Sequence, residues 1–273
     1  MSQPSHPSAK YSSQHYWEQR FATETHYEWL CTFADIAPLL APFLGSSSPP
    51  QSYLVLGTGT SALPADLAAA YPSASVLATD YSTVLIEALQ RQPVASSNLA
   101  YAYADMLRLE VLAAACPAFG SLDAVFDKGA LDALVSAEGD SWQVPSELLA
   151  TSARVVQGVH AALREGGRYF MLSFSQPHFR AMHLLQQRSS AQGGGEGPAA
   201  GAAQGGGEGP AATAAGAAAQ QAASEEDEGE WEADLNPDPV RAAIPPVAGS
   251  YWSHFEHRVV ERGLGIFLYI CTK

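Results

Sequence analysis

Short apolar runs alternate with amphipathic stretches along most of the chain, and this alternation predicts an α/β fold. The apolar runs that we interpret as strands are residues 52–56, 75–79, 99–104, 122–126, 168–174, 254–260 and 266–272. Helices are predicted at 61–70, capped by Ser61, at 82–90, capped by Ser82, and at 151–163, stopped by Gly166-Gly167. We therefore expect a doubly wound, seven-stranded, mostly parallel sheet with an antiparallel C-terminal strand pair.

The stretch from 189 to 247 breaks this pattern. Gly-Gly-Gly-Glu-Gly-Pro-Ala-Ala occurs at 193–200 and again at 205–212, and Ala/Gln-rich and acidic stretches follow. Such a composition cannot bury enough apolar surface to offset the entropy lost on ordering. We predict a single domain over 15–273, interrupted by a disordered insertion over 189–247 and preceded by a flexible N-terminal tail over 1–14.

The net charge of −14 is concentrated in the predicted insertion. Ten Asp and Glu residues and no Lys or Arg lie between 189 and 240, so the rest of the chain carries only −4. A protein that binds nucleic-acid backbones needs a basic stripe, so we expect no nucleic acid partner. A basic protein remains open as a substrate.

Cysteine spacing and hydropathy exclude further classes. The three cysteines are scattered without a Cys-x-x-Cys pair, which argues against a disulfide framework or a metal site. His178 and His183 lack a third ligand at metal spacing and are interpreted as structural. The chain shows no signal-peptide pattern and no run of about 18 apolar residues, so we expect a cytoplasmic protein without membrane contact.

Three of the predicted strands end on residues suited to a nucleoside. Gly57-Thr58-Gly59 follows the first strand, Asp80 the second and Asp105 the third. The carboxyl ends of parallel strands meet at one edge of a sheet, so these residues surround one ligand. Glycine lets the backbone approach that ligand closely, and a carboxylate accepts hydrogen bonds from ribose hydroxyls. The second acid is an acceptor for an exocyclic amine such as that of adenine.

Longer stretches carry a resemblance to a known family. They are Tyr16-Trp17-Glu18-Gln19-Arg20-Phe21, Tyr27-Glu28-Trp29-Leu30, residues 55–63, Asp80-Tyr81-Ser82, residues 127–134 (Asp-Lys-Gly-Ala-Leu-Asp-Ala-Leu), Pro177-His178-Phe179-Arg180 and Phe267-Leu268-Tyr269. With them the chain resembles the class I S-adenosylmethionine-dependent methyltransferases, and more narrowly the methyltransferase-like family that includes lysine methyltransferases of eukaryotic elongation factor 1-alpha. The resemblance covers about residues 15–187 and 250–273.

The resemblance implies a Rossmann-like fold, S-adenosyl-L-methionine as cofactor and a protein lysine as methyl acceptor, with elongation factor 1-alpha as a candidate partner. We expect a monomer. The implied cofactor-binding residues are Gly57 and Gly59 under the methionyl part, Asp80 at the ribose, Tyr81, Asp105 and Met106 around the adenine, Trp17, Phe21 and Trp29 closing over the cofactor, and Lys128 on the fourth strand. For the aromatic residues, an ordinary lid on the hydrophobic core is the alternative. Ala130 replaces a threonine that is usual in the family, which removes a hydroxyl.

Asp127 is the candidate catalytic residue. Methyl transfer from a sulfonium is a direct displacement, so the protein must mainly align the acceptor and exclude water. Asp127 ends the fourth strand, where the acceptor meets the methyl group, and we interpret it as orienting the incoming amine. The alternative is a carboxylate that pairs with Lys128 or caps the next turn. Asp132 is predicted to cap or brace the following helix.

Two other functions remain open. Gly57-x-Gly59-x-x-Ala62 also satisfies the looser dinucleotide fingerprint of an NAD-dependent dehydrogenase. That function leaves Asp105, Asp127 and Lys128 without a role. A methyltransferase fold that binds partners without catalysis, with the insertion as a recruitment arm, is the third hypothesis.

Overall fold

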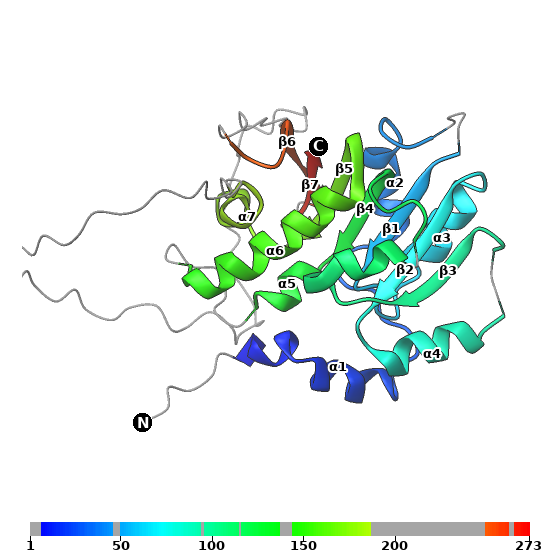
Figure 1. Ribbon diagram of the computed structural model, residues 1–273. Coiled ribbons are helices and arrows are strands. Elements are labelled where there is room, and N and C mark those ends of the chain that lie inside the picture. Colours follow the sequence, from blue (N-terminus) through cyan, green and yellow to red (C-terminus); the bar gives the residue numbers. More distant parts are fainter. Residues whose placement is uncertain are drawn as a thin grey trace, which may run out of the picture. The chain divides into compact units, whose positions relative to one another are not determined.

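Seven strands form one sheet in the order β3-β2-β1-β4-β5-β7-β6 (Figure 1). They are β1 (Ser52–Leu56), β2 (Ser75–Asp80), β3 (Leu99–Tyr103), β4 (Leu122–Lys128), β5 (Leu163–Ser173), β6 (His254–Glu261) and β7 (Ile266–Thr272). The first five are parallel, and β7 runs antiparallel to both β5 and β6. The predicted fold class is therefore confirmed.

The computed structural model describes residues 7–45, 50–93, 96–114, 116–136, 144–186, 249–261 and 265–273. The insertion predicted at 189–247 lies outside the described residues. The described helices are η1 (Pro7–Ser12), α1 (Gln14–Phe21), α2 (Phe33–Leu40), α3 (Leu63–Ala70), α4 (Thr83–Arg91), η2 (Met106–Ala114), α5 (Ala130–Leu134), α6 (Ser146–Ala162) and α7 (Pro177–Leu184). None of these is long and apolar enough to cross a membrane.

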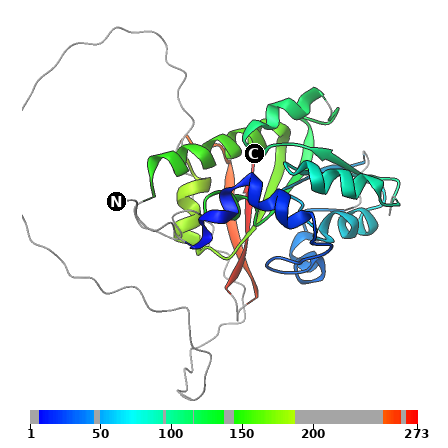
Figure 2. The ribbon, with the colours of Figure 1, turned by 90° about the horizontal axis from the view of Figure 1, so that it is seen from below.

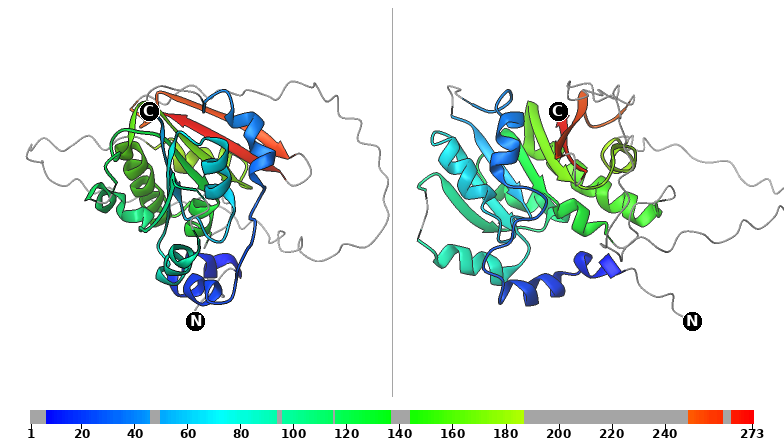
Figure 3. Two further views of the ribbon diagram at one scale, coloured as in Figure 1. Left: turned by 90° about the vertical axis from the view of Figure 1, so that its right-hand side faces the viewer. Right: turned by 180° about the vertical axis from the view of Figure 1, so that it is seen from behind.

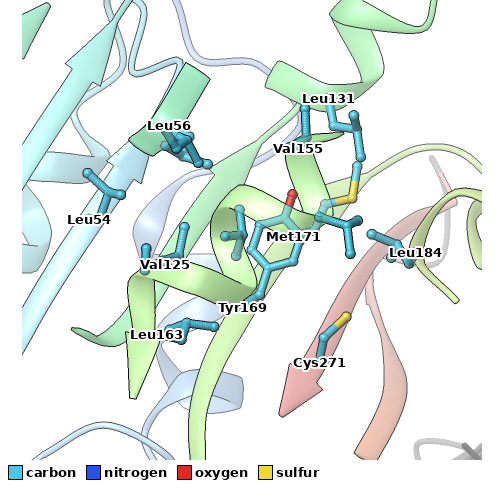
Figure 4. Packing of buried hydrophobic residues seen from close by; sticks show 14 of the residues in the cluster. Leu54, Leu56, Val125, Leu131, Val155, Leu163, Tyr169, Met171, Leu184 and Cys271 are labelled. Atoms are coloured by element: carbon cyan, nitrogen blue, oxygen red, sulfur yellow. The ribbon is translucent and has the colours of Figure 1, made fainter. Parts of the chain in front are cut away.

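The period-two alternation of the strands builds a hydrophobic core on each face of the sheet. Leu54 and Leu56 of β1 face η2, α5, α6 and α7, whereas Tyr53 and Val55 face α2 and α3 (Figure 3). Figure 4 shows the first core, in which the Tyr169 ring lies among aliphatic side chains from the sheet and the helices. Burial on both faces explains why the central strands appear as continuous apolar runs in the sequence.

The structure confirms the predicted start of α4 but not the predicted starts of α3 and α6. Ser82 caps α4 as expected, its hydroxyl accepting a hydrogen bond from Leu85 N at 3.2 Å. Ser61 does not occupy the cap of α3, because that helix begins at Leu63 after Ala62. The helix predicted at 151–163 begins earlier, at Ser146, and has ended before Gly166 is reached.

Gly166 and Gly167 form an irregularity in β5 instead of stopping a helix, which corrects the prediction. Gly166 has φ +71°, and a Cβ at Gly167 would lie 2.8 Å from the carbonyl oxygens of Arg164 and Leu122. The pairing of β5 with β4 shifts here, from Leu122 opposite Leu163 to Ala124 opposite Arg168. Only glycine fits so close to two backbones, so these glycines mark a bulge.

Part of the predicted N-terminal tail belongs to the folded structure. Residues 7–12 form the 3-10 helix η1, and the Tyr11 carbonyl accepts a hydrogen bond from the Trp17 indole nitrogen at 2.7 Å. The Tyr11 ring lies edge-on to the Trp29 ring, with 5.8 Å between centroids. Aromatic contacts that are remote in sequence hold this segment, and composition did not reveal them.

Candidate functional site

The glycine turn after β1 is held in a conformation that favours glycine. Gly57 has φ +53° and Gly59 has φ +51°. A Cβ at Gly57 would lie 2.4 Å from the Ala130 Cβ, so the turn packs directly on the first residue of α5. Gly59 N donates to Asp80 Oδ2 at 3.0 Å. The structure thus joins Gly59, one of the two glycines that the resemblance assigns to the methionyl part, to Asp80, which it assigns to the ribose.

Asp80 is 3% exposed and accepts hydrogen bonds from two backbone amides, Gly59 N and, at 2.9 Å, Ser82 N. Burial raises the pKa of its carboxyl to about 6, and the amide hydrogen bonds oppose that rise. Each carboxylate oxygen has a second lone pair that these amides do not use. The carboxylate therefore retains the acceptor capacity that two ribose hydroxyls require.

The residues predicted around the adenine lie on the neighbouring strand end. Ala104 N donates to the Asp80 carbonyl at 2.9 Å, which places the end of β3 beside that of β2. Burial raises the pKa of the Tyr81 phenol, and the charges of Asp80 and Asp105 raise it further. Asp105 Oδ1 accepts a hydrogen bond from Leu107 N at 2.9 Å, and Met106 packs against the first core. The structure brings these residues together.

The three predicted aromatic residues form one cluster over the glycine turn. The rings of Trp17 and Phe21 stack with 5.4 Å between centroids, and Trp29 lies edge-on to Trp17 at 6.2 Å. A Cβ at Gly59 would lie 3.8 Å from the Phe21 ring. Figure 2 looks onto the sheet from below and shows α1 lying across it. The Phe21 ring therefore lies against the turn with Trp17 stacked on it, and closure of Trp17 and Trp29 over a cofactor stays a prediction.

Three glutamates of the N-terminal segment attach it to the loops after β1 and β2. The Glu18 carboxylate accepts from Ser82 Oγ at 2.6 Å and from Thr83 N at 2.9 Å, at the start of α4. Glu24 accepts from Thr60 Oγ1 at 2.8 Å. Glu28 accepts from Ala62 N at 2.6 Å, at the start of α3. Carboxylates at helix N-termini are stabilised by the helix dipole and free amides.

Sequence reasoning gave these glutamates no role, although Glu18 and Glu28 lie inside the quoted motifs. Nothing in the local sequence around Glu18 or Glu28 indicates which helix start its carboxylate binds. Their partners in the loops after β1 and β2 and at the starts of α3 and α4 lie 33 to 66 positions away in the chain.

The described contacts of Lys128 are all made within the protein. Its ammonium donates to the Glu28 carboxylate, to the Trp29 carbonyl at 3.1 Å and to the Cys31 carbonyl at 3.2 Å. These three acceptors use all three of its hydrogens. The geometry therefore supports a bridge from β4 to the N-terminal segment, and a cofactor contact by Lys128 stays a prediction without support from these distances.

Asp127 is fully buried and caps α5. Its carboxylate accepts hydrogen bonds from Ala130 N at 2.7 Å, Leu131 N at 3.1 Å and the Tyr169 hydroxyl at 2.8 Å. Burial raises the pKa of the carboxyl to about 6. These contacts support the capping alternative, and they do not support a carboxylate that reaches a substrate amine. The catalytic assignment of Asp127 therefore remains an untested prediction.

Other predicted structural roles agree with the contacts. Asp132 braces α5, because its carboxylate accepts from Ser173 Oγ at 2.8 Å and pairs with Arg180 at 2.7 Å. His183 Nδ1 lies 3.0 Å from Ser152 Oγ, and burial lowers the pKa of this histidine to about 4. Across the described ranges no group of three or more His, Cys, Asp or Glu side chains is arranged to hold a metal ion.

The residues present fit an S-adenosyl nucleoside at this edge of the sheet. Thr58 Oγ1, between the two glycines, is buried and has no hydrogen-bond partner among the described residues. Gly59 presents its backbone without a side chain, and Asp80 keeps free lone pairs. An unpaired hydroxyl, a bare backbone and a carboxylate are the groups that bind a polar nucleoside.

Comparison with known proteins places the chain among methyltransferases. No protein-family model matches it. The chain is 37% identical over 185 residues to "EEF1A lysine methyltransferase 4" of Mus musculus, a match that covers 66% of this chain and 68% of that protein. It is 30% identical over 175 residues to "Methyltransferase srdJ" of Neurospora crassa, which covers 62% and 69%.

Solved structures are more distant. A Haemonchus contortus phosphoethanolamine N-methyltransferase 1, in complex with phosphoethanolamine and S-adenosylhomocysteine, aligns with a TM-score of 0.40 and 20% identity. The alignment covers 62% of this chain and 33% of that one.

Proposed function

We propose that this chain, which belongs to the class I S-adenosylmethionine-dependent methyltransferases and within them to the family of EEF1A lysine methyltransferase 4, methylates a lysine side chain of a protein. The hydrogen bond from Gly59 N to Asp80 supports the cofactor part of the proposal, because it builds the nucleoside side of the site from two strand ends, and the 37% identity to a lysine methyltransferase supports the acceptor. The cofactor is S-adenosylmethionine, which supplies when bound an activated methyl group on sulfur.

The chain's own residues divide the work of holding the cofactor. In this proposal Asp80 accepts hydrogen bonds from the ribose hydroxyls and Asp105 accepts one from the adenine amine, and both carboxylates lie close enough to Tyr81 for their charges to raise the pKa of its phenol. The aromatic cluster of Trp17, Phe21 and Trp29 covers the glycine turn and excludes water from it. Excluding water strengthens each polar contact and prevents the methyl group from being lost to solvent.

A protein lysine presents a protonation problem that the site must address. The reference pKa of lysine is about 10.4, so only about one amine in 10³ is neutral at pH 7. Aromatic faces hold cationic head groups. We assign the lysine side chain and its methylated products to Trp17 and Trp29, whose rings already attract a cation, because the Arg20 guanidinium lies 5.5 and 5.1 Å from their centroids.

Elongation factor 1-alpha is the candidate substrate, since the mouse relative is named as an EEF1A lysine methyltransferase. The mild acidity of the chain outside residues 189–240 is compatible with a basic protein partner. We include a cytoplasmic location and a monomeric state in the proposal.

Methyl transfer can be measured directly with tritiated S-adenosylmethionine, a eukaryotic lysate and recombinant elongation factor 1-alpha, followed by mass spectrometry of the labelled protein. We expect label on one lysine, and we expect the Asp80→Ala variant to lose it together with cofactor affinity. Label in nucleic acid or in a small molecule would contradict a protein substrate. Cofactor binding without any transfer would favour the binding module, and calorimetric binding of NAD in place of S-adenosylmethionine would favour the dehydrogenase.

A further inference from the structure

Arg180 of α7 carries a buried guanidinium with unused hydrogen-bond donors. Its side chain is 4% exposed, and one terminal nitrogen, Nη2, donates to Asp132 Oδ1 at 2.7 Å. Nε and Nη1 have no partner in the part of the chain that the structure describes. Buried donors are nearly always paired, so an arginine with two unpaired nitrogens points to an acceptor beyond the described residues.

The position of Arg180 assigns that acceptor to the substrate side of the site. Asp132 lies two residues after Ala130, whose Cβ packs against Gly57. The sheet order places β4 and β5, which precede α5 and α7, on one side of β1. On the other side lie β2, which ends at Asp80, and β3, which ends two residues before Asp105. Arg180 is therefore near the glycine turn but away from the nucleoside residues.

The charges around Arg180 favour a neutral acceptor. Its positive charge is already balanced by the Asp132 carboxylate, and the charge of Asp132 also acts on the nearby Asp127 carboxyl, whose pKa is raised mainly by burial. A carboxylate on the ligand would be repelled by the negative charges of Asp132 and Asp127. What the guanidinium lacks is hydrogen-bond acceptors and not negative charge.

We propose, resting on the function proposed above, that Arg180 donates its free Nε and Nη1 hydrogens, which point to different edges of the guanidinium, to main-chain carbonyl oxygens of the substrate segment that carries the target lysine. A carbonyl oxygen accepts hydrogen bonds and adds no charge. A free alkylamine offers no such acceptor. Arg180 is thereby a specificity-determining residue that selects a lysine embedded in a polypeptide.

The variant Arg180→Lys tests this role, because it keeps a positive charge opposite Asp132 and removes the planar fork of donors. With recombinant elongation factor 1-alpha as the probe, we expect kcat/KM to fall about ten- to a hundredfold, chiefly through KM. The Kd for S-adenosylmethionine and the Tm stay near wild type. The matched control is Arg258→Lys, a mostly buried arginine on β6 that pairs with Glu256 and contacts α2 through the Leu39 carbonyl. It should leave kcat/KM unchanged.

An unchanged kcat/KM in Arg180→Lys overturns the inference, as does a parallel loss of cofactor affinity, which would place Arg180 at the cofactor. If this variant does not fold, the double variant Asp132→Asn with Arg180→Gln replaces the ion pair by a neutral hydrogen-bonded pair, and the same criteria apply to it. A wild-type chain that methylates no protein overturns both the proposed function and this inference. An active wild type with an unaffected variant overturns the inference alone.

Discussion

Gly57 and Gly59 share a left-handed backbone conformation but differ in the space around them. A Cβ at Gly57 collides with the Ala130 Cβ at 2.4 Å, whereas one at Gly59 meets only the Phe21 ring at 3.8 Å. Gly59→Ala should cost about 1 kcal/mol through backbone strain alone, and Gly57→Ala about 2–4 kcal/mol because overpacking adds to the strain. Denaturant unfolding of both variants measures the difference. Equal losses would mean that the clash with α5 is relieved without cost.

The buried Asp127 carboxyl predicts a specific pH dependence of stability. Its pKa is about 6 in the folded protein and near 4 when unfolded, so the folded state holds this proton more tightly. The resulting stability is complete below about pH 4 and is lost as the pH rises through about 6, at a total cost of about 3 kcal/mol. In Asp127→Asn this loss is absent, so the variant gains about 3 kcal/mol relative to wild type between pH 4 and pH 7.

Urea unfolding of wild type and Asp127→Asn at several pH values measures this gain. The comparison isolates Asp127, because Asp80, which has a similar pKa, is present in both proteins. A difference that does not vary with pH contradicts the prediction. Methyl transfer measured on the same samples decides the role of Asp127: near wild-type activity supports the cap, and a loss above about a hundredfold with intact stability restores the orienting role.

At the scale of elements, the N-terminal segment is attached to the sheet by polar contacts and not by pairing with a strand. In Figures 1 and 3, α1 lies beside α4, and Glu18 connects the two. Glu28 makes the corresponding connection to α3 and pairs with Lys128 of β4. The position of the aromatic cluster therefore depends on a few carboxylates.

The Glu28→Gln variant tests this dependence, since glutamine keeps the acceptor for Ala62 N but leaves the Lys128 ammonium without a charged partner. We expect a loss of about 1–3 kcal/mol in stability and about tenfold weaker binding of S-adenosylmethionine, measured by calorimetry. The matched control is Glu87→Gln, which breaks the exposed pair with Arg91 and should change stability by no more than about 0.5 kcal/mol. Wild-type cofactor affinity in Glu28→Gln would show that the ion pair does not position the cluster.

Predictions at this scale succeeded where the signal was local. The capping serine at 82 and the strand pair at the C-terminus follow from contiguous residues and were correct. The start of α6 and the bulge at Gly166-Gly167 were not predicted, because the bulge depends on how close β4 approaches. A glycine pair after a helical pattern has the same appearance in sequence whether it ends a helix or bends a strand.

For the whole molecule, composition predicts that residues 189–247 remain outside the packed domain. A protease that cleaves after glutamate should therefore cut the native protein first within 225–230, where four glutamates lie in six residues. Glu18 and Glu28, which are bound at helix starts, should resist until global unfolding. Mass spectrometry of a digestion time course reads both rates. Simultaneous cleavage at all of these positions would contradict the predicted division.

The sequence by itself determined the seven strands, three of the helices and the family, and it predicted the strand-end residues of the nucleoside site. These features are encoded in alternating hydrophobicity, in glycines that tolerate positive φ and in contiguous motifs, all of which act locally. Only the tertiary structure decided the partners of Lys128, Asp127 and Arg180. Many different acceptors can pair with a charged side chain, so the sequence does not specify which one does. Lys128 pairs with Glu28, one hundred positions away, because packing of the sheet brings these two segments together.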